Sequence, residues 1–435
     1  MTYPWRHFRD DEWWRQIPAW KDVDYKTFID HKWQEKNAIT NHKKLLKTIQ
    51  DLVSQDFLED AKNGFLKAPM AIRVSPYLLS LMSWETPDTC PIRRQFLPLA
   101  SQLQPDHPML RFDSLNEQED APVKGLTHRY QDKVLFLALD ICPVYCRFCT
   151  RAYAVGSSTA TAEKVSIKAS SARWADIFKY LREHEEVEDV VISGGDAYRL
   201  KAKQIIEIGE ELISIPHIRR FRFATKGLSV LPMKLLTDEP WIDAIASVTN
   251  RAHNHYKEVC IHTHFNHANE ITKITQDAMK LLFLKGVKVR NQAVFQRGVN
   301  DTPKDMIALT RQLGYMNVEP YYVYVHDLTA GTEDMRTSVQ TALDVEKHVR
   351  GVTAGFNTPT FVVDAPGGGG KRCAHSFEHY NRETGVSVYT APSVKPGQKF
   401  LYFDPIHSLS EDKQIAWTKK EFQEEMVRNA LRAVK

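Results

Sequence analysis

The chain lacks the features that assign a protein to several large classes. It has no apolar run close to the ~18 residues that a membrane-spanning helix needs. Its first residues, from Met1 to Arg6, do not show the charged-then-apolar pattern of a secretory signal. Six cysteines in 435 residues are too few for a disulfide scaffold. A net charge of +4 gives no argument for a nucleic-acid partner. These absences predict a cytoplasmic protein that binds neither membrane nor nucleic acid.

What the chain does have is the composition of an ordinary folded protein. With 43% hydrophobic and 26% charged residues, a chain of this length can bury a large core. Shifts in pattern divide it into an N-terminal aromatic arm and helical region (1–66), a proline-rich wrapping segment (67–132), a main domain (133–371) and a C-terminal extension with a terminal helix (372–435). The early aromatic residues are expected to cover an edge of the main fold, although a docking arm is an alternative. They are Tyr3, Trp5, Phe8, Trp13 and Trp14.

The main domain alternates short β-branched runs with helical patterns. The candidate strands are Val134–Leu139, Val187–Ser193, Arg219–Thr225, Val259–His264, Val287–Phe295, Val318–Val325 and Thr358–Val363. Thr302 and Pro303 are expected to begin a helix that Gly314 ends, and Gly351 to end another. Such alternation is typical of parallel βα units with right-handed crossovers. We therefore expect an α/β fold, a partial (open) βα barrel of about six to seven parallel strands with N-terminal helical and C-terminal extensions.

Unusual polar residues lie in or directly after every candidate strand. Because the carboxyl ends of parallel strands meet at one mouth of a barrel, these residues predict a single large polar pocket. In chain order they are Cys142 to Cys149, Ser193 to Asp196, Thr225 to Gly227, His262 to His267, Asn291 and Gln292, Asp327, and Asp364 to Lys371.

Three cysteines stand close together after the first of these strands. Cys142, Cys146 and Cys149 fall within eight residues, at spacings of four and three. Thiolates this close in a reducing compartment predict a shared metal or cluster. Three thiolates leave one iron of a four-iron cluster open to an external ligand, whereas common ferredoxin frameworks supply a fourth cysteine. A zinc site would need a fourth ligand from His262, His264 or His267.

This cysteine spacing is that of the radical S-adenosylmethionine enzymes, and its wider context resembles the lysine 2,3-aminomutase family. The resemblance extends from about Trp33 to Lys371. The motifs that carry it are Gly125-Leu-Thr-His-Arg-Tyr130, Cys146-Arg-Phe-Cys-Thr-Arg151, Ser193-Gly-Gly-Asp-Ala197, Thr263-His-Phe-Asn-His267, Gly298-Val-Asn300 and Val363-Asp-Ala-Pro-Gly-Gly-Gly-Gly-Lys371. It implies an isomerase that converts L-lysine to β-lysine (3,6-diaminohexanoate) with a 4Fe-4S cluster, S-adenosylmethionine and pyridoxal phosphate.

The resemblance also implies a role for individual residues. The three cysteines would hold the cluster, and Lys371 would be the catalytic residue that forms the internal aldimine with pyridoxal phosphate. Arg129 would bind the phosphate of that cofactor together with Lys133, which stands where family members have arginine. The contacts to S-adenosylmethionine would come from Ser193, Gly194, Gly195, Asp196 and Gln292.

The implied substrate site consists of one arginine and two aspartates. Arg151 would pair with the α-carboxylate, while Asp327 and Asp364 would bind the distal ammonium, which favours lysine first and arginine or another basic amino acid second. A zinc site of the kind some members carry is not expected, since no cysteine follows Cys373. The resemblance implies an electron donor such as a flavodoxin or ferredoxin, and it is compatible with a homo-oligomer. The alternative from another class is a non-catalytic iron–sulfur electron carrier or scaffold.

Overall fold

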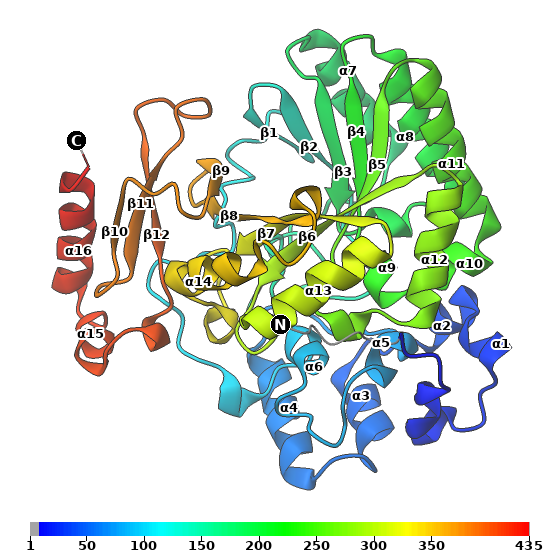
Figure 1. Ribbon diagram of the computed structural model, residues 1–435, viewed down its shortest axis with the longest axis horizontal. Helices are drawn as coiled ribbons and strands as arrows, with labels where there is room; N and C mark the ends of the chain where they lie inside the picture. The colour runs from blue at the N-terminus through cyan, green and yellow to red at the C-terminus, as the bar shows by residue number, and fades with distance from the viewer. Residues whose placement is uncertain (1–7, 435) are drawn as a thin grey trace.

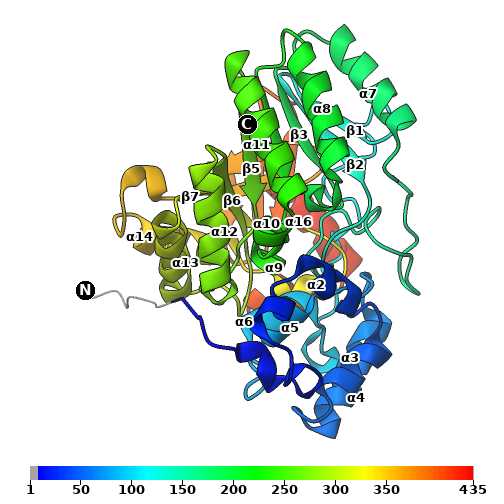
Figure 2. The same cartoon turned by 90° about the vertical axis from the view of Figure 1, so that its right-hand side faces the viewer.

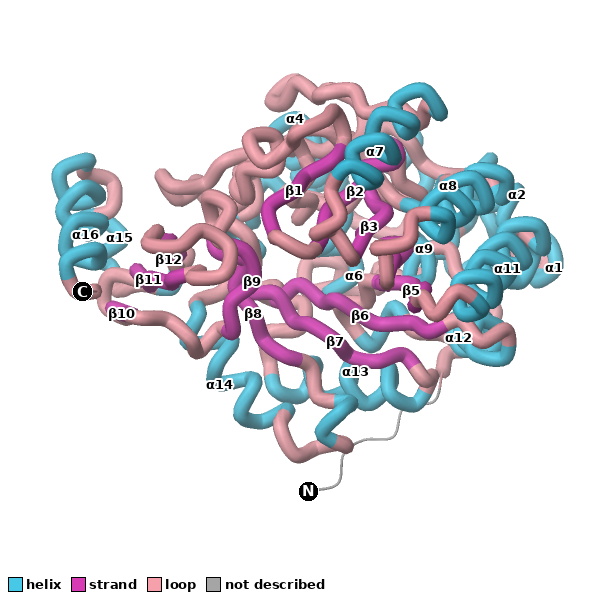
Figure 3. Tube along the Cα trace, turned by 90° about the horizontal axis from the view of Figure 1, so that it is seen from above, coloured by secondary structure: helices cyan, strands magenta, loops and turns pink. Residues whose placement is uncertain are grey.

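A nine-stranded sheet forms the centre of the protein, whose computed structural model describes residues 8–434. The strands follow one another in chain order, from β1 at one edge to β9 at the other. They are β1 (Leu126–Tyr130), β2 (Lys133–Leu139), β3 (Asp189–Gly194), β4 (Arg220–Ala224), β5 (Glu258–Thr263), β6 (Lys288–Phe295), β7 (Val318–Val325), β8 (Thr360–Ala365) and β9 (Gly370–Cys373). Figure 3 shows the strands along an arc with helices outside it, so the sheet is a partial barrel.

Seven of these strands confirm the sequence prediction, with bounds that move by at most two residues. Strands β2 to β8 are parallel throughout. The two edge strands were not predicted. Strand β1 pairs antiparallel with β2, and β9 pairs antiparallel with β8. The edges meet at one hydrogen bond, in which the Lys371 backbone N–H donates to the Tyr130 hydroxyl at 2.9 Å.

Helices cover the outer face of the sheet, and Figure 2 shows α8 and α11 side by side upon it. The helices are α7 (Ser171–Glu183), α8 (Ala202–Ser214), α9 (Gly227–Val230), α10 (Lys234–Thr237), α11 (Glu239–Asn254), α12 (Lys273–Leu284), α13 (Pro303–Tyr315) and α14 (Val339–Val349). Helix α7 buries Trp174, Ile177, Phe178 and Leu181, an i, i+3, i+4, i+7 stripe. No helix among residues 8–434 has both the length and the apolar character needed to cross a membrane.

Helix α13 confirms one predicted boundary and corrects the other. The side chain of Thr302 accepts a hydrogen bond from the Asp305 backbone N–H and so caps the helix. Gly314 does not end it, because the helix continues to Tyr315 and the left-handed residue that follows is Asn317, with φ of 56°. The missing side chain at Gly314 instead allows close packing, since a Cβ there would lie 2.9 Å from the amide nitrogen of Asn357. Gly351, with φ of 97°, follows α14 as expected.

Six helices of the N-terminal region lie below the barrel in Figure 1. They are α1 (Tyr25–Phe28), α2 (His31–Asn37), α3 (His42–Ile49), α4 (Gln55–Lys67), α5 (Pro76–Ser80) and α6 (Pro91–Phe96). Trp13 and Trp14 are buried, and Trp14 stacks on Phe28 with ring centroids 4.1 Å apart. Phe8 reaches the main fold, where its ring centroid lies 5.6 Å from that of Tyr315 of α13, whereas Tyr3 and Trp5 lie outside the described residues. The described part of the aromatic arm therefore covers an edge of the main fold.

The C-terminal extension contains structure that the sequence did not predict. A three-stranded antiparallel sheet comprises β10 (His379–Asn381), β11 (Val386–Thr390) and β12 (Lys399–Phe403). The expected single terminal helix is two, α15 (Glu411–Ala416) and α16 (Lys420–Arg432), because Trp417 turns inward, is fully buried and donates to the Thr384 carbonyl. Tyr402 of β12 donates to the His326 carbonyl at 2.7 Å, so this extension supports the segment that precedes Asp327.

Candidate active site

One pocket of about 430 Å³ lies inside the barrel, and side chains from both edges of the sheet line it. Every site residue proposed from the sequence lines this pocket except Gly194. The structure therefore brings together residues as far apart in the chain as Arg129 and Lys371.

The three clustered cysteines follow β2 in a loop fastened to the wrapping segment. The Tyr145 backbone N–H donates to the Arg73 carbonyl, and that of Arg147 to the Gln95 carbonyl. The Arg147 guanidinium is buried against Asp334 at 2.9 Å. All three thiols are free and line the pocket, and among the described residues no fourth cysteine joins them there. This donor set fits a four-iron cluster with one open iron.

The Ser193-Gly-Gly-Asp196 segment holds the start of the cysteine loop. The backbone N–H of Gly195 donates to the Leu139 carbonyl, and that of Asp196 to the Ile141 carbonyl. Gly194 has φ of 116° and lies against the backbone of β2, where a Cβ would collide with the Leu139 carbonyl. Ser193, Gly195 and Asp196 face the pocket and Gly194 does not, so close strand packing explains the first glycine of this segment.

Asp196 and Gln292 have protein partners of their own. The buried Asp196 carboxylate accepts backbone N–H groups from Tyr198 and Lys226, each at 2.8 Å. The Gln292 amide contacts His262 Nδ1 at 3.0 Å, while His262 Nε2 is buried without a hydrogen-bond partner among the described residues. The free imidazole nitrogen gives the pocket a further polar group.

Lys371 occupies a fixed position because of the hairpin that contains it. Residues Pro366 to Gly369 form the turn between β8 and β9, and the antiparallel register places Lys371 directly opposite Asp364. Their side chains meet with the ammonium 3.4 Å from the Asp364 carboxylate. Gly370 has φ of 74°, and a Cβ there would lie 2.6 Å from the Tyr130 hydroxyl. The glycines thus serve the turn and a close approach between the sheet edges.

The charge state of Lys371 depends on the anion beside it. Burial alone would lower the pKa of its ammonium, but the Asp364 carboxylate and the phenols of Tyr324 and Tyr130 outweigh burial and raise that pKa well above its ordinary value. An amine reacts as a nucleophile only after deprotonation. The Asp364 carboxylate beside it favours the protonated form of Lys371.

Arginine and lysine side chains collect on the β1–β4 side of the pocket. Arg129 is buried and ion-paired with Asp120 at 3.0 Å, with Asp364 3.8 Å away. Lys133 lies 4.5 Å above the Tyr130 ring and pairs with Asp132. Arg222, which the sequence did not single out, lines the same pocket. It pairs with Asp189 at 2.7 Å, and its Nε is buried without a partner in the described part of the chain.

The two predicted substrate aspartates are both buried in the pocket wall. One carboxylate oxygen of Asp327 and one of Asp364 lack a hydrogen-bond partner among residues 8–434. Burial and the neighbouring Asp364 carboxylate raise the pKa of Asp327 to about 8. A second buried charge beside the ion-paired Asp364 is costly, so once Asp327 is ionised the pair favours a cation in addition to Lys371 and Arg129.

Glu117 is a site residue that the sequence analysis missed. Its buried carboxylate binds Arg151 with both oxygens, to Nε and to Nη2 at 3.1 Å each. The Tyr153 hydroxyl donates to the same carboxylate at 2.9 Å. The Arg151 Nη1 has no hydrogen bond to the described residues. The edge of the guanidinium that Nη1 and Nη2 form is therefore free for a second carboxylate.

Known proteins resemble this chain over most of its length. A family model described as lysine-2,3-aminomutase matches residues 346–376. The L-lysine 2,3-aminomutase of Fusobacterium nucleatum is 35% identical over 384 residues, which cover 85% of this chain and 84% of that protein. The L-lysine 2,3-aminomutase of Bacillus subtilis is 34% identical over 412 residues, or 92% and 83%. The glutamate 2,3-aminomutase of Clostridioides difficile is 33% identical over 344 residues, or 79% and 75%. The chain therefore belongs to the lysine 2,3-aminomutase family, a family of isomerases, and carries the cysteine motif of radical S-adenosylmethionine enzymes.

Proposed function

We propose that the protein is an L-lysine 2,3-aminomutase that produces β-lysine with a 4Fe-4S cluster, S-adenosylmethionine and pyridoxal phosphate. The observation that carries the proposal is that three free thiols, Lys371 and two incompletely paired buried carboxylates share one pocket. The cluster and S-adenosylmethionine would supply the radical that removes hydrogen, and pyridoxal phosphate would carry the migrating amino group.

Distinct residues would hold each of these groups. Cys142, Cys146 and Cys149 would bind the cluster, and Lys371 would hold pyridoxal phosphate. Three cations that line the pocket with Lys371 would attract the phosphate: they are Arg129, Lys133 and Arg222, and the Nε of Arg222 is a buried donor without a partner among the described residues. The residues proposed for S-adenosylmethionine are Ser193, Gly195, Asp196 and Gln292. A low-potential flavodoxin or ferredoxin would deliver the electron.

Arg151 would bind the substrate carboxylate with the edge that Glu117 leaves free. A guanidinium offers two edges for bidentate hydrogen bonding, and Glu117 takes the Nε edge. The pair is buried on the Glu117 side, and Tyr153 fixes the carboxylate from another direction. Glu117 therefore orients Arg151 for a second carboxylate.

We expect Glu117→Gln to raise the KM for lysine about tenfold, because Arg151 loses the charged partner that holds its guanidinium in place. The change in kcat should be smaller, since Glu117 lies behind the guanidinium. Steady-state kinetics of the reconstituted enzyme provide the measurement, with Glu119→Gln as the matched exposed control in the same loop. A KM equal to that of the wild type would show that Glu117 does not position Arg151.

Asp327 and Asp364 would bind the distal ammonium of lysine. Two carboxylates with open lone pairs favour a cation and oppose a second carboxylate, which would leave them unpaired. Arginine is the second candidate, since its guanidinium is also a cation. Glutamate is disfavoured although a glutamate 2,3-aminomutase is among the relatives. An electron carrier would use neither Lys371 nor the aspartate pair.

The pKa of Asp327 predicts how lysine binding changes with pH. Below about 8 this carboxyl is protonated in the free protein and cannot pair with an ammonium. The lysine side chain itself stays charged up to its pKa of about 10.4. The KM for lysine should therefore fall as the pH rises toward about 8, by about tenfold per pH unit at most. Asp327→Asn should lose this dependence, and an unchanged slope in that variant would contradict the assignment.

Anaerobic reconstitution with iron, sulfide and pyridoxal phosphate tests the cofactor proposal. The purified protein should show both the broad visible absorbance of a 4Fe-4S cluster and a band of lysine-bound pyridoxal phosphate that borohydride abolishes. A cluster spectrum without the second band would exclude the aminomutase and favour an electron carrier.

A further inference from the structure

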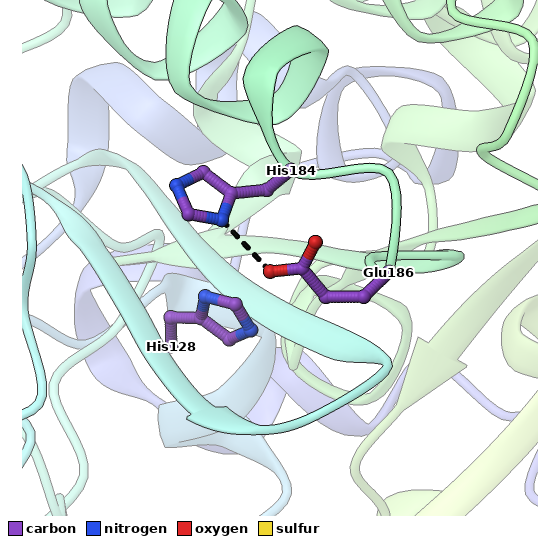
Figure 4. A group of neighbouring side chains, drawn as sticks. All are labelled: His128, His184 and Glu186. Carbon is purple, nitrogen blue, oxygen red and sulfur yellow. Dashed lines mark hydrogen bonds and ion pairs between the residues drawn. The ribbon is translucent and has the colours of Figure 1, made fainter.

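Three side chains of types that can bind a metal converge in Figure 4, and none of them lines the pocket that the three cysteines share. His128 belongs to edge strand β1, His184 follows the end of α7, and Glu186 lies in the connection to β3. Successive residues of a strand face opposite sides, so His128 points toward α7 while Arg129 lines the pocket. The chemistry considered for the pocket uses none of these three groups.

Their geometry is close to that of a metal site. One ligand atom from each residue lies within 4.8 Å of the other two. Zinc–ligand bonds of about 2.1 Å separate tetrahedral ligands by about 3.4 Å. The His184 Nδ1 and a Glu186 carboxylate oxygen are 2.8 Å apart, so these two atoms must move slightly apart to bind the same ion. His128 requires a closing movement of at most about 1.4 Å, which a partly exposed side chain on an edge strand can make.

A neighbouring tyrosine orients the histidines as a metal site requires. The Tyr180 hydroxyl of α7 meets His128 Nδ1 at 2.8 Å. No hydrogen bond to His128 Nε2 is found in the described part of the chain, and this is the nitrogen that would face the ion. A ligand histidine characteristically has its second nitrogen hydrogen-bonded in this way. The Tyr180 ring also stacks on His184, with ring centroids 3.9 Å apart.

We propose that His128, His184 and Glu186 bind one divalent zinc-like metal ion, with water as the fourth ligand. Two imidazoles and a carboxylate suit zinc better than calcium or magnesium, which prefer oxygen ligands. The ion would join β1 to the α7–β3 connection. Strand β1 carries Arg129 and Tyr130, and Tyr130 holds the Lys371 backbone, so the ion would brace one wall of the pocket. The proposal does not depend on the reaction catalysed.

The test is zinc binding to untagged, full-length, cluster-reconstituted protein. After equilibrium dialysis against micromolar buffered zinc, metal analysis should find one more equivalent of zinc per chain in the wild type than in His184→Ala or Glu186→Gln. Tyr180→Phe should weaken zinc binding by about 10–100-fold. His253→Ala, which removes an exposed histidine of α11, should match the wild type.

Zinc should also raise the Tm of the wild type and not that of Glu186→Gln, whose substitution at a half-exposed side chain leaves the fold intact. Any zinc held by the cysteines is common to all variants and cancels in the comparison. Equal zinc content in the wild type, His184→Ala and Glu186→Gln would overturn the proposal. A loss of zinc in His253→Ala as large as that in His184→Ala would also overturn it.

Discussion

Lys371→Ala should reduce lysine turnover to background and abolish the borohydride-sensitive pyridoxal phosphate band, while the cluster spectrum persists. The reason is that, among the lysines the structure describes, only Lys371 stands opposite Asp364 in the pocket that the three cysteines share. The cysteine loop is held by the wrapping segment and by β3, neither of which contacts Lys371 through a hydrogen bond. Absorbance spectra and a product assay on the same preparation give both measurements.

Lys203→Ala, which removes an exposed lysine of α8, is the matched control and should retain full activity. If Lys371→Ala keeps the pyridoxal phosphate band, the cofactor is held by another residue. If it loses the band but turns lysine over at the wild-type rate, pyridoxal phosphate takes no part in the reaction.

At a pH above about 8, where Asp327 is charged, Asp327→Asn should lower kcat/KM for lysine at least about thirtyfold, since removal of one charge from a buried pair costs about 2–5 kcal/mol. The cluster and pyridoxal phosphate should remain bound, because no hydrogen bond in the described part of the chain joins the Asp327 side chain to Lys371 or to the cysteine loop. The measurement is kcat/KM for lysine, arginine and glutamate with each variant. Asp243→Asn, an exposed aspartate of α11 paired with Lys285, serves as control.

The same substitution should increase the stability of the fold at high pH, although it lowers activity. The folded-state pKa of Asp327 is raised above its unfolded value of 3.8, so its protonated form favours the fold and that contribution is lost as the pH rises toward about 8. Asp327→Asn should therefore be more stable than the wild type at pH values above about 8 and similar to it near pH 4. Lysine turnover within threefold of the wild type would refute the substrate assignment.

Strong local patterns made the parallel strands and a common polar pocket at their carboxyl ends predictable from the sequence, whereas the individual site residues came from the family resemblance. The strands β2 to β8 are β-branched, buried runs whose order follows from right-handed crossovers. The edge strands were missed because β1 (Leu-Thr-His-Arg-Tyr) and β9 (Gly-Lys-Arg-Cys) are short and polar. Each is stabilised by pairing with a single neighbouring strand, and a local sequence pattern does not reveal that pairing.

Contacts across the sequence account for what else was missed. Asp364 and Lys371 were assigned separate roles, yet the β8–β9 hairpin makes them an ion pair, so one residue influences the proton of the other. Glu117 stands in an acidic loop that looks solvated, and its partner Arg151 is 34 residues away. The three strands of the C-terminal extension lie in a segment rich in turn residues and depend on mutual pairing.

The most direct test of the aminomutase proposal is product formation by the reconstituted protein. The enzyme is incubated anaerobically with S-adenosylmethionine, a reductant and an equimolar mixture of L-lysine, L-arginine and L-glutamate, and each β-amino acid is quantified by mass spectrometry. We expect β-lysine as the main product. Preferential formation of β-glutamate or β-arginine, or no β-amino acid from a protein that binds all three cofactors, would contradict the proposal.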